Sequence, residues 1–153
     1  MLAPGPGWPK AMQPWQLGAA EAARLIKRKE LSPVELADSC LERADALDPA
    51  IRAWVTVDRD GARQAAAALR DRLAAGDPPG PLAGVPVGVK DVIDVAGLPT
   101  TASSKALADA GPAERAASSN SAVRSIASQP SSPHEPGQVL TCSRIGSRAV
   151  PRT

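Results

Sequence analysis

Apolar residues recur at three- and four-residue spacing over two early segments of the chain, as they do on one face of a helix. The first segment, residues 17–30, consists of good helix formers with a modest apolar stripe. The second, residues 32–47, opens with the string SPVE, which has the pattern of a capping box with proline at the first helical position. We predict a helix over each segment, with Asp48-Pro49 ending the second.

Residues 52–58 change to a period of two. Their alanine and valines would lie on one face and Trp54 on the other, which predicts a strand. A third helix is predicted from about residue 60 to 75, because alanine and leucine again recur at helical spacing. The glycines and prolines of GDPPG at 76–80 are typical of a turn that ends this helix.

The segment GPLAGVPVGVKDVIDVAGLPTTASS, residues 80–104, is rich in valine and glycine. It predicts a short buried strand, a turn around Gly97 and a Thr/Ser loop. Beyond Glu114 the periodicity is lost, and apolar residues are scattered among serines, prolines and arginines.

Both ends of the chain differ in composition from the middle. Residues 1–14 are dense in proline and glycine, and residues 115–153 have too few apolar residues to offset the entropy lost on folding. We therefore expect a flexible leader at 1–14, a partial domain at 15–114 and a disordered tail at 115–153. With 153 residues, one domain is the upper limit.

The net charge of the chain limits the classes of molecule that it is expected to bind. The formal net charge is +2, which is too small to indicate binding to nucleic acid or to an anionic membrane. The distribution is uneven, because residues 115–153 contain five arginines, no lysine and a single acid, Glu135. We expect no nucleic acid and no membrane among the partners, and the oligomeric state stays open.

The two cysteines, Cys40 and Cys142, lie far apart without CxxC spacing, so neither a disulfide framework nor a zinc site is indicated. Helical spacing places Cys40 in the core. No apolar run approaches the length of a membrane span, and prolines and glycines interrupt the N-terminus where a signal peptide would be apolar. We expect a cytoplasmic protein without a metal or a cofactor.

Lys90 is the candidate for chemistry, because it lies between valines in the predicted strand. A buried ammonium is costly, and desolvation without a neighbouring carboxylate lowers the pKa of a lysine, which then can act as a general base. Strand alternation would send Asp91 to the opposite face. The alternative is an edge-strand lysine that extends to water. A phosphate-binding loop is disfavoured, because the GK[ST] ending is absent.

The run of residues 80–104 resembles the lysine segment of the amidase signature family, and the SPVEL helix, the AWVTV strand and the Ala-rich helix resemble what precedes it there. The resemblance covers about residues 16–110. It implies that Lys90 is the catalytic lysine of a Ser-cisSer-Lys triad, which accepts a proton relayed through a cis-peptide serine from a nucleophilic serine. It also implies a small-molecule amide substrate, and structural roles for Asp91 and Asp94.

In that family the two serines belong to a Gly/Ser-rich segment of GGSSGG type, which this sequence lacks. We interpret the serine pairs that are present as loop serines, since no paired glycines flank them. These pairs are Ser103-Ser104, Ser118-Ser119 and Ser131-Ser132. The family usually has glycine in place of Ser103. The single histidine, His134, lies between Pro133 and Glu135 and is interpreted as incidental.

The fold we expect is α/β: an N-terminal fragment of an amidase-signature domain, with helices beside the start of a mixed sheet whose edge is open. Three functions compete. The first is a truncated amidase-family hydrolase that is inactive alone, the second a non-catalytic partner or subunit of an amidase or amidotransferase complex, and the third a small hydrolase using tail serines. The substrate stays open.

The change of composition at residue 115 is abrupt, and Arg, Ser and Pro are what GC-rich codons yield out of phase. It predicts a frameshift near codon 115, which the nucleotide sequence in the other two frames would test.

Overall fold

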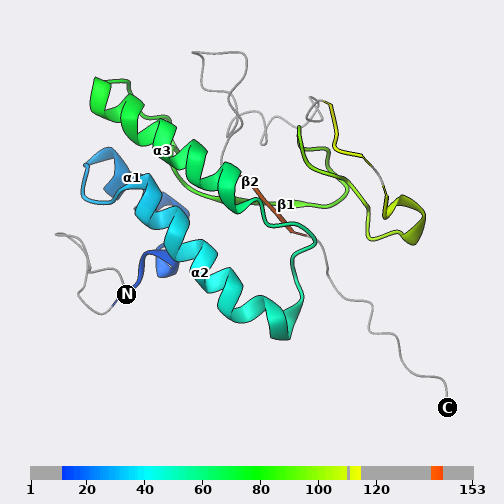
Figure 1. Ribbon diagram of the computed structural model, residues 1–153. Helices are drawn as coiled ribbons and strands as arrows, with labels where there is room; N and C mark the ends of the chain where they lie inside the picture. Colours follow the sequence, from blue (N-terminus) through cyan, green and yellow to red (C-terminus); the bar gives the residue numbers. More distant parts are fainter. Residues whose placement is uncertain (1–11, 110, 115–138, 143–153) are drawn as a thin grey trace.

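The computed structural model describes residues 12–109, 111–114 and 139–142. A short 3-10 helix, η1 (Pro14–Gln16), is followed by three α-helices, α1 (Ala19–Lys27), α2 (Pro33–Ile51) and α3 (Arg59–Ala75). Strand β1 (Val87–Lys90), a second 3-10 helix η2 (Lys105–Leu107) and strand β2 (Val139–Cys142) complete the order. Helices α2 and α3 lie side by side and run in opposite directions, with α1 against them (Figure 1).

The start of α2 is the predicted capping box. The Ser32 amide donates to Oε2 of Glu35 over 2.9 Å, and the Ser32 hydroxyl accepts from the amide of Val34 over 3.2 Å. Pro33 occupies the first helical position, where its missing N–H would have no helical partner. Because these bonds involve residues within one turn, the sequence was sufficient to predict this helix start.

The end of α2 differs from the prediction that Asp48-Pro49 would stop it, because the helix continues through Pro49 to Ile51. Proline removes one amide donor, but the following turn still closes when the amide of Arg52 donates to the Asp48 carbonyl. Oδ1 of Asp48 also accepts from the amides of Ala53 and Trp54, over 2.7 and 3.0 Å. The Asp48 side chain thus satisfies donors at the helix exit and supports the extra turn.

The strand predicted over residues 52–58 is wrong, because the structure has only a single bridge residue there, Thr56. Trp54 and Val57, three residues apart, pack against buried Leu41 and Ala62, whereas Val55 is 44% exposed. The segment therefore has no alternating inner and outer face. It connects two packed helices, and contacts with those helices decide which side chains point inward.

Helix α3 confirms the third predicted helix within one residue at its start. Oδ1 of Asp58 accepts from the amide of Gly61 over 2.9 Å and caps the N-terminus. At the other end Gly76 has φ +100°, and the amide of Asp77 donates to the Arg72 carbonyl. This left-handed glycine ends the helix in the expected GDPPG turn.

The main core lies among the three α-helices and the segment that leads to β1. Its fully buried members are aliphatic, and partly buried apolar side chains pack around them. The buried members are Ala22, Leu25, Ile26, Leu31 and Leu36, and the surrounding ones are Leu17, Cys40, Leu73 and Val85. Cys40 is therefore partly buried and packs against the core, on the side that its spacing predicted. Burial raises the pKa of its thiol above the ordinary value.

Strands β1 and β2 pair in parallel, with Val87 opposite Val139 and Lys90 opposite Cys142. Helices followed by the start of a sheet confirm the predicted α/β class. Strand β2 lies inside the tail at 115–153, so the expectation that this tail holds no regular structure is wrong at Val139–Cys142. The other residues of the tail, and residues 1–11 of the leader predicted at 1–14, lie outside the described residues. In the part described, no helix combines the length and apolarity needed to cross a membrane.

Candidate functional site

Lys90 is the last residue of β1, and its side chain is exposed rather than buried. Alternation along the strand is as predicted, but the faces are the other way round. Gly88 and Lys90 are exposed, whereas Val89 and Asp91 are only 4% and 5% exposed. The expectation that Lys90 is desolvated on the sheet is therefore wrong for the chain as described, because the buried face of the strand is the one that bears Val89.

The buried carboxylate of Asp91 organises the loop that follows the strand. Oδ1 accepts from the amide of Thr101 over 2.8 Å. Oδ2 accepts from the Thr101 hydroxyl over 2.5 Å and from the amide of Ser103 over 3.1 Å. The main-chain carbonyl of Asp91 accepts a further bond, from the amide of Ala102 over 2.8 Å. The Thr/Ser loop expected from the sequence is thus anchored to the residue next to Lys90.

Two successive residues of this loop have left-handed backbone, with φ +50° at Ala102 and +54° at Ser103. A residue with a Cβ adopts this conformation at a cost of about 1–2 kcal/mol. The usual glycine of the family at position 103 fits the conformation, so the departure noted in the sequence falls at a strained position. The role of Asp91 itself could not be found from spacing, because its partners are ten to twelve residues away.

The other candidate site residues either have a different role from Lys90 or lie outside the described residues. Asp94 is exposed, whereas Asp91 is buried, so the two acids do not share one environment. The Ser104 hydroxyl accepts from the amide of Ala106 over 3.3 Å and caps η2, which is a structural role. The serine pairs at 118–119 and 131–132, and His134, lie outside the described residues. Among the described residues no group of three or more acidic, histidine or cysteine side chains could hold a metal ion.

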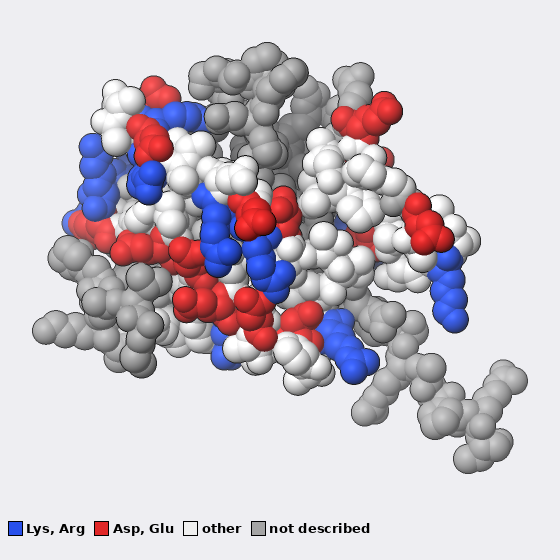
Figure 2. Space-filling model, in the orientation of Figure 1, with Lys and Arg blue, Asp and Glu red and all other residues white. Residues whose placement is uncertain are grey.

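Ion pairs cover the helices away from this site. Arg63 pairs with Asp38 over 2.7 Å and Arg59 pairs with Asp45, so both contacts link α3 to α2. Figure 2 shows acidic side chains gathered over α2 with basic side chains beside them. Such exposed pairs contribute little to stability, so this surface is interpreted as a solvated helix face.

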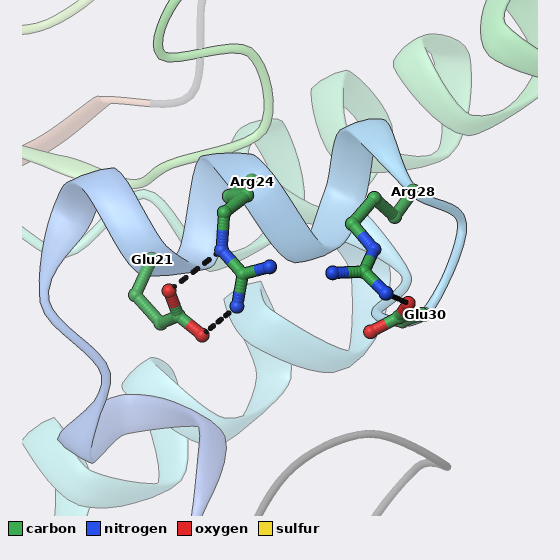
Figure 3. A network of polar contacts seen from close by, with 4 residues as sticks. All are labelled: Glu21, Arg24, Arg28 and Glu30. Atoms are coloured by element: carbon green, nitrogen blue, oxygen red, sulfur yellow. Dashed lines mark hydrogen bonds and ion pairs between the residues drawn. The ribbon is translucent and has the colours of Figure 1, made fainter.

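A second group of ion pairs lies on and just after α1 (Figure 3). Both oxygens of Glu21 accept from Arg24, over 2.9 and 2.5 Å, and Arg28 pairs with Glu30 over 2.6 Å. The hydrogen bond from Arg24 holds the pKa of the Glu21 carboxyl below its ordinary value. These side chains bond to one another at the surface and contribute no group to the lysine site.

A shallow pocket lies where α1 and α3 end. It is lined by Ile26, Lys27, Lys29, Leu73, Gly76, Asp77, Pro78 and Pro79. Neither Lys90 nor the Asp91 loop takes part in it. Lysines suit this place because helix C-termini carry negative partial charge. The pocket therefore gives no support to a substrate site at Lys90.

The chain belongs to the amidase signature family, because the family model Amidase matches residues 35–120, more than half of the chain. Lys90 and the Asp91 loop both fall within the match. A glutamyl-tRNA(Gln) amidotransferase subunit of Salinispora tropica is 53% identical over 91 residues, which are 60% of this chain and 18% of that protein. The corresponding subunit of Carboxydothermus hydrogenoformans is 45% identical over 96 residues, 63% of this chain and 20% of that protein.

Solved structures show the same fold. A bacterial aryl acylamidase of the amidase signature family has 34% identity and a TM-score of 0.68, over 82% of this chain and 25% of its own. The native peptide amidase of Stenotrophomonas maltophilia has 31% identity and a TM-score of 0.58, over 63% and 20% respectively. This chain spans about a fifth of the length of the curated relatives it matches.

Proposed function

We propose that this chain is the lysine-bearing N-terminal segment of an amidase domain, with Lys90 as the base of a Ser-cisSer-Lys triad for amide hydrolysis. The supporting observation is the position of Lys90 within GVPVGVKD, inside the matched range 35–120 and at the end of a strand followed by an anchored loop. The substrate would be a small-molecule amide, and no metal or cofactor enters the scheme. We also propose a cytoplasmic location.

The chemistry requires groups that this sequence does not contain. A base accelerates acyl transfer only by taking a proton from a nucleophile, and the GGSSGG-type segment of the family is absent from the 153 residues. In addition, the Lys90 side chain is exposed in the chain as described. We therefore expect the chain alone to be inactive, and the remainder of an amidase domain to supply both the serines and the cover for Lys90.

The second candidate is a subunit or non-catalytic partner of an amidase or amidotransferase complex. It is favoured by the 53% identity to an amidotransferase subunit over 91 residues. In this case the chain would act by binding other subunits. A turnover assay on the isolated chain cannot separate the two candidates, because both predict that the chain alone hydrolyses no amide.

The role of Lys90 can be tested in a chimera that replaces the matched N-terminal part of the bacterial aryl acylamidase with residues 12–109 of this chain. In that chimera Lys90→Ala should lower kcat for an aryl amide by about 10²-fold or more, the range of general-base catalysis. Lys105→Ala, which changes another exposed lysine, is the matched control and should leave kcat unchanged. An active chimera that tolerates Lys90→Ala as well as it tolerates Lys105→Ala would refute the proposal.

A further inference from the structure

The residue that follows Lys90 is tied to a loop ten to twelve residues further along the chain. Asp91 is 5% exposed, and its carboxylate accepts hydrogen bonds from the Thr101 amide, the Thr101 hydroxyl and the Ser103 amide. The peptide carbonyl of Asp91 accepts the Ala102 amide. Side chain and main chain of one residue therefore hold the same three-residue loop.

The loop backbone is arranged to receive an anionic oxygen. Left-handed φ angles at Ala102 and Ser103 turn the amides of Thr101 and Ser103 toward a common acceptor. Successive amides in such turns form concavities that bind anions. Here the anion is the Asp91 carboxylate itself, and bonds to a charged acceptor are stronger than bonds between neutral groups. These bonds offset the conformational cost of two left-handed residues that bear a Cβ.

Lys90 and Asp91 lie in different environments. Alternation places the Lys90 side chain on the exposed face and the Asp91 side chain on the buried one. The connection between them is the peptide bond that joins β1 to the anchored loop. Amides of Val92 and Ile93 also donate back to the Lys90 carbonyl, over 2.8 and 3.0 Å, so the chain turns sharply directly after the strand.

We propose that Asp91 is a positioning residue for Lys90: it anchors the Thr101–Ser103 loop and thereby sets the direction in which the end of β1 presents the lysine. The relevance of this proposal to catalysis rests on the proposed function of Lys90 as a base. The anchoring itself concerns only the described geometry. Asp91→Asn keeps the shape of the side chain but removes the charge, and its NH₂ group would face either the Ser103 amide or the Thr101 amide, which are both donors.

The test uses the full chain, with Asp94→Asn as matched control because Asp94 is an exposed acid of the same segment. In Asp91→Asn, amide hydrogen exchange followed by NMR should become at least about tenfold faster at Thr101 and Ser103, as expected for loss of bonds to a charged acceptor. The residual dipolar coupling of the Lys90 amide, which reports the orientation of the last peptide of β1, should change as well. Asp94→Asn should alter neither quantity.

Each outcome decides the proposal. Unchanged exchange at Thr101 and Ser103 in Asp91→Asn would overturn the anchoring. Faster exchange with an unchanged Lys90 coupling would reduce Asp91 to a loop anchor and overturn the positioning role. If Asp91→Asn does not fold, Thr101→Val serves as a second variant, because it removes only the bond from the Thr101 hydroxyl. It should give smaller changes in the same exchange rates and in the Lys90 coupling. No change in Thr101→Val would also overturn the proposal. None of these readouts requires amide hydrolysis, so a failure of the proposed function would be seen separately, in the chimera.

Discussion

Gly84 is the position where an added methyl group should be most damaging. It has φ +82°, and a Cβ there would lie 2.8 Å from Cδ1 of Ile26, 3.2 Å from Cβ of Pro33 and 3.3 Å from Cδ2 of Leu69. Residues of all three α-helices thus surround it. Left-handed backbone costs alanine about 1–2 kcal/mol, and overpacking a close-packed site adds about 1–3 kcal/mol. We expect Gly84→Ala to lower the free energy of unfolding by about 2–5 kcal/mol.

Gly97 supplies a matched control. Its φ is +81°, but a Cβ there would meet nothing within 4 Å. Gly97→Ala carries the same backbone cost and the same loss of entropy in the unfolded chain, so it should cost only about 1–2 kcal/mol. The difference of about 1–3 kcal/mol between the two variants isolates the steric term. Urea unfolding followed by helical circular dichroism at equal m-values measures it.

If the loss of stability in Gly84→Ala is steric, removing the atom that the new Cβ meets should reduce that loss. Ile26→Val removes the methyl group closest to the new Cβ, so its effect combined with Gly84→Ala should be smaller than the sum of the two single effects. Equal losses of stability in Gly84→Ala and Gly97→Ala, or full additivity of the pair with Ile26→Val, would refute the reasoning and leave backbone strain as the whole effect.

Three more predictions follow from local features of the helices. Ser32→Ala removes the hydroxyl of the capping box and should lower the free energy of unfolding by about 1 kcal/mol in the same urea assay, whereas a loss below about 0.2 kcal/mol would contradict the role of the box. Asp48→Ala leaves the amides of Ala53 and Trp54 without their acceptor and should cost about 1–3 kcal/mol, with Trp54 fluorescence as a second probe. Burial raises the pKa of Cys40, so the folded state holds the thiol proton more tightly than the unfolded state. Stability should therefore fall as pH rises above the unfolded value of about 8.5. That fall should be absent from the profile of stability against pH measured for Cys40→Ala.

The sequence alone determined the parts of this protein whose stabilising contacts are local. Ser32 and Glu35 bond within one turn, and Gly76 ends α3 through its own backbone conformation, so composition and spacing were sufficient to predict where α2 begins and where α3 ends. The family followed from the motif around Lys90, because that run of residues is specific in itself.

Tertiary structure decided the features that depend on distant residues. The segment 52–58 alternates in sequence but packs Trp54 and Val57 against α2 and α3, so contacts with the helices overrode its period of two. Which face of β1 is buried was likewise decided only in the folded chain, where Val89 is buried and Lys90 is exposed. The bonds from Asp91 to a loop at positions 101–103 form only when the chain has folded back. A pattern of apolar residues specifies which positions can share a face, but only the packing of whole elements determines which face is covered and which side chains become partners.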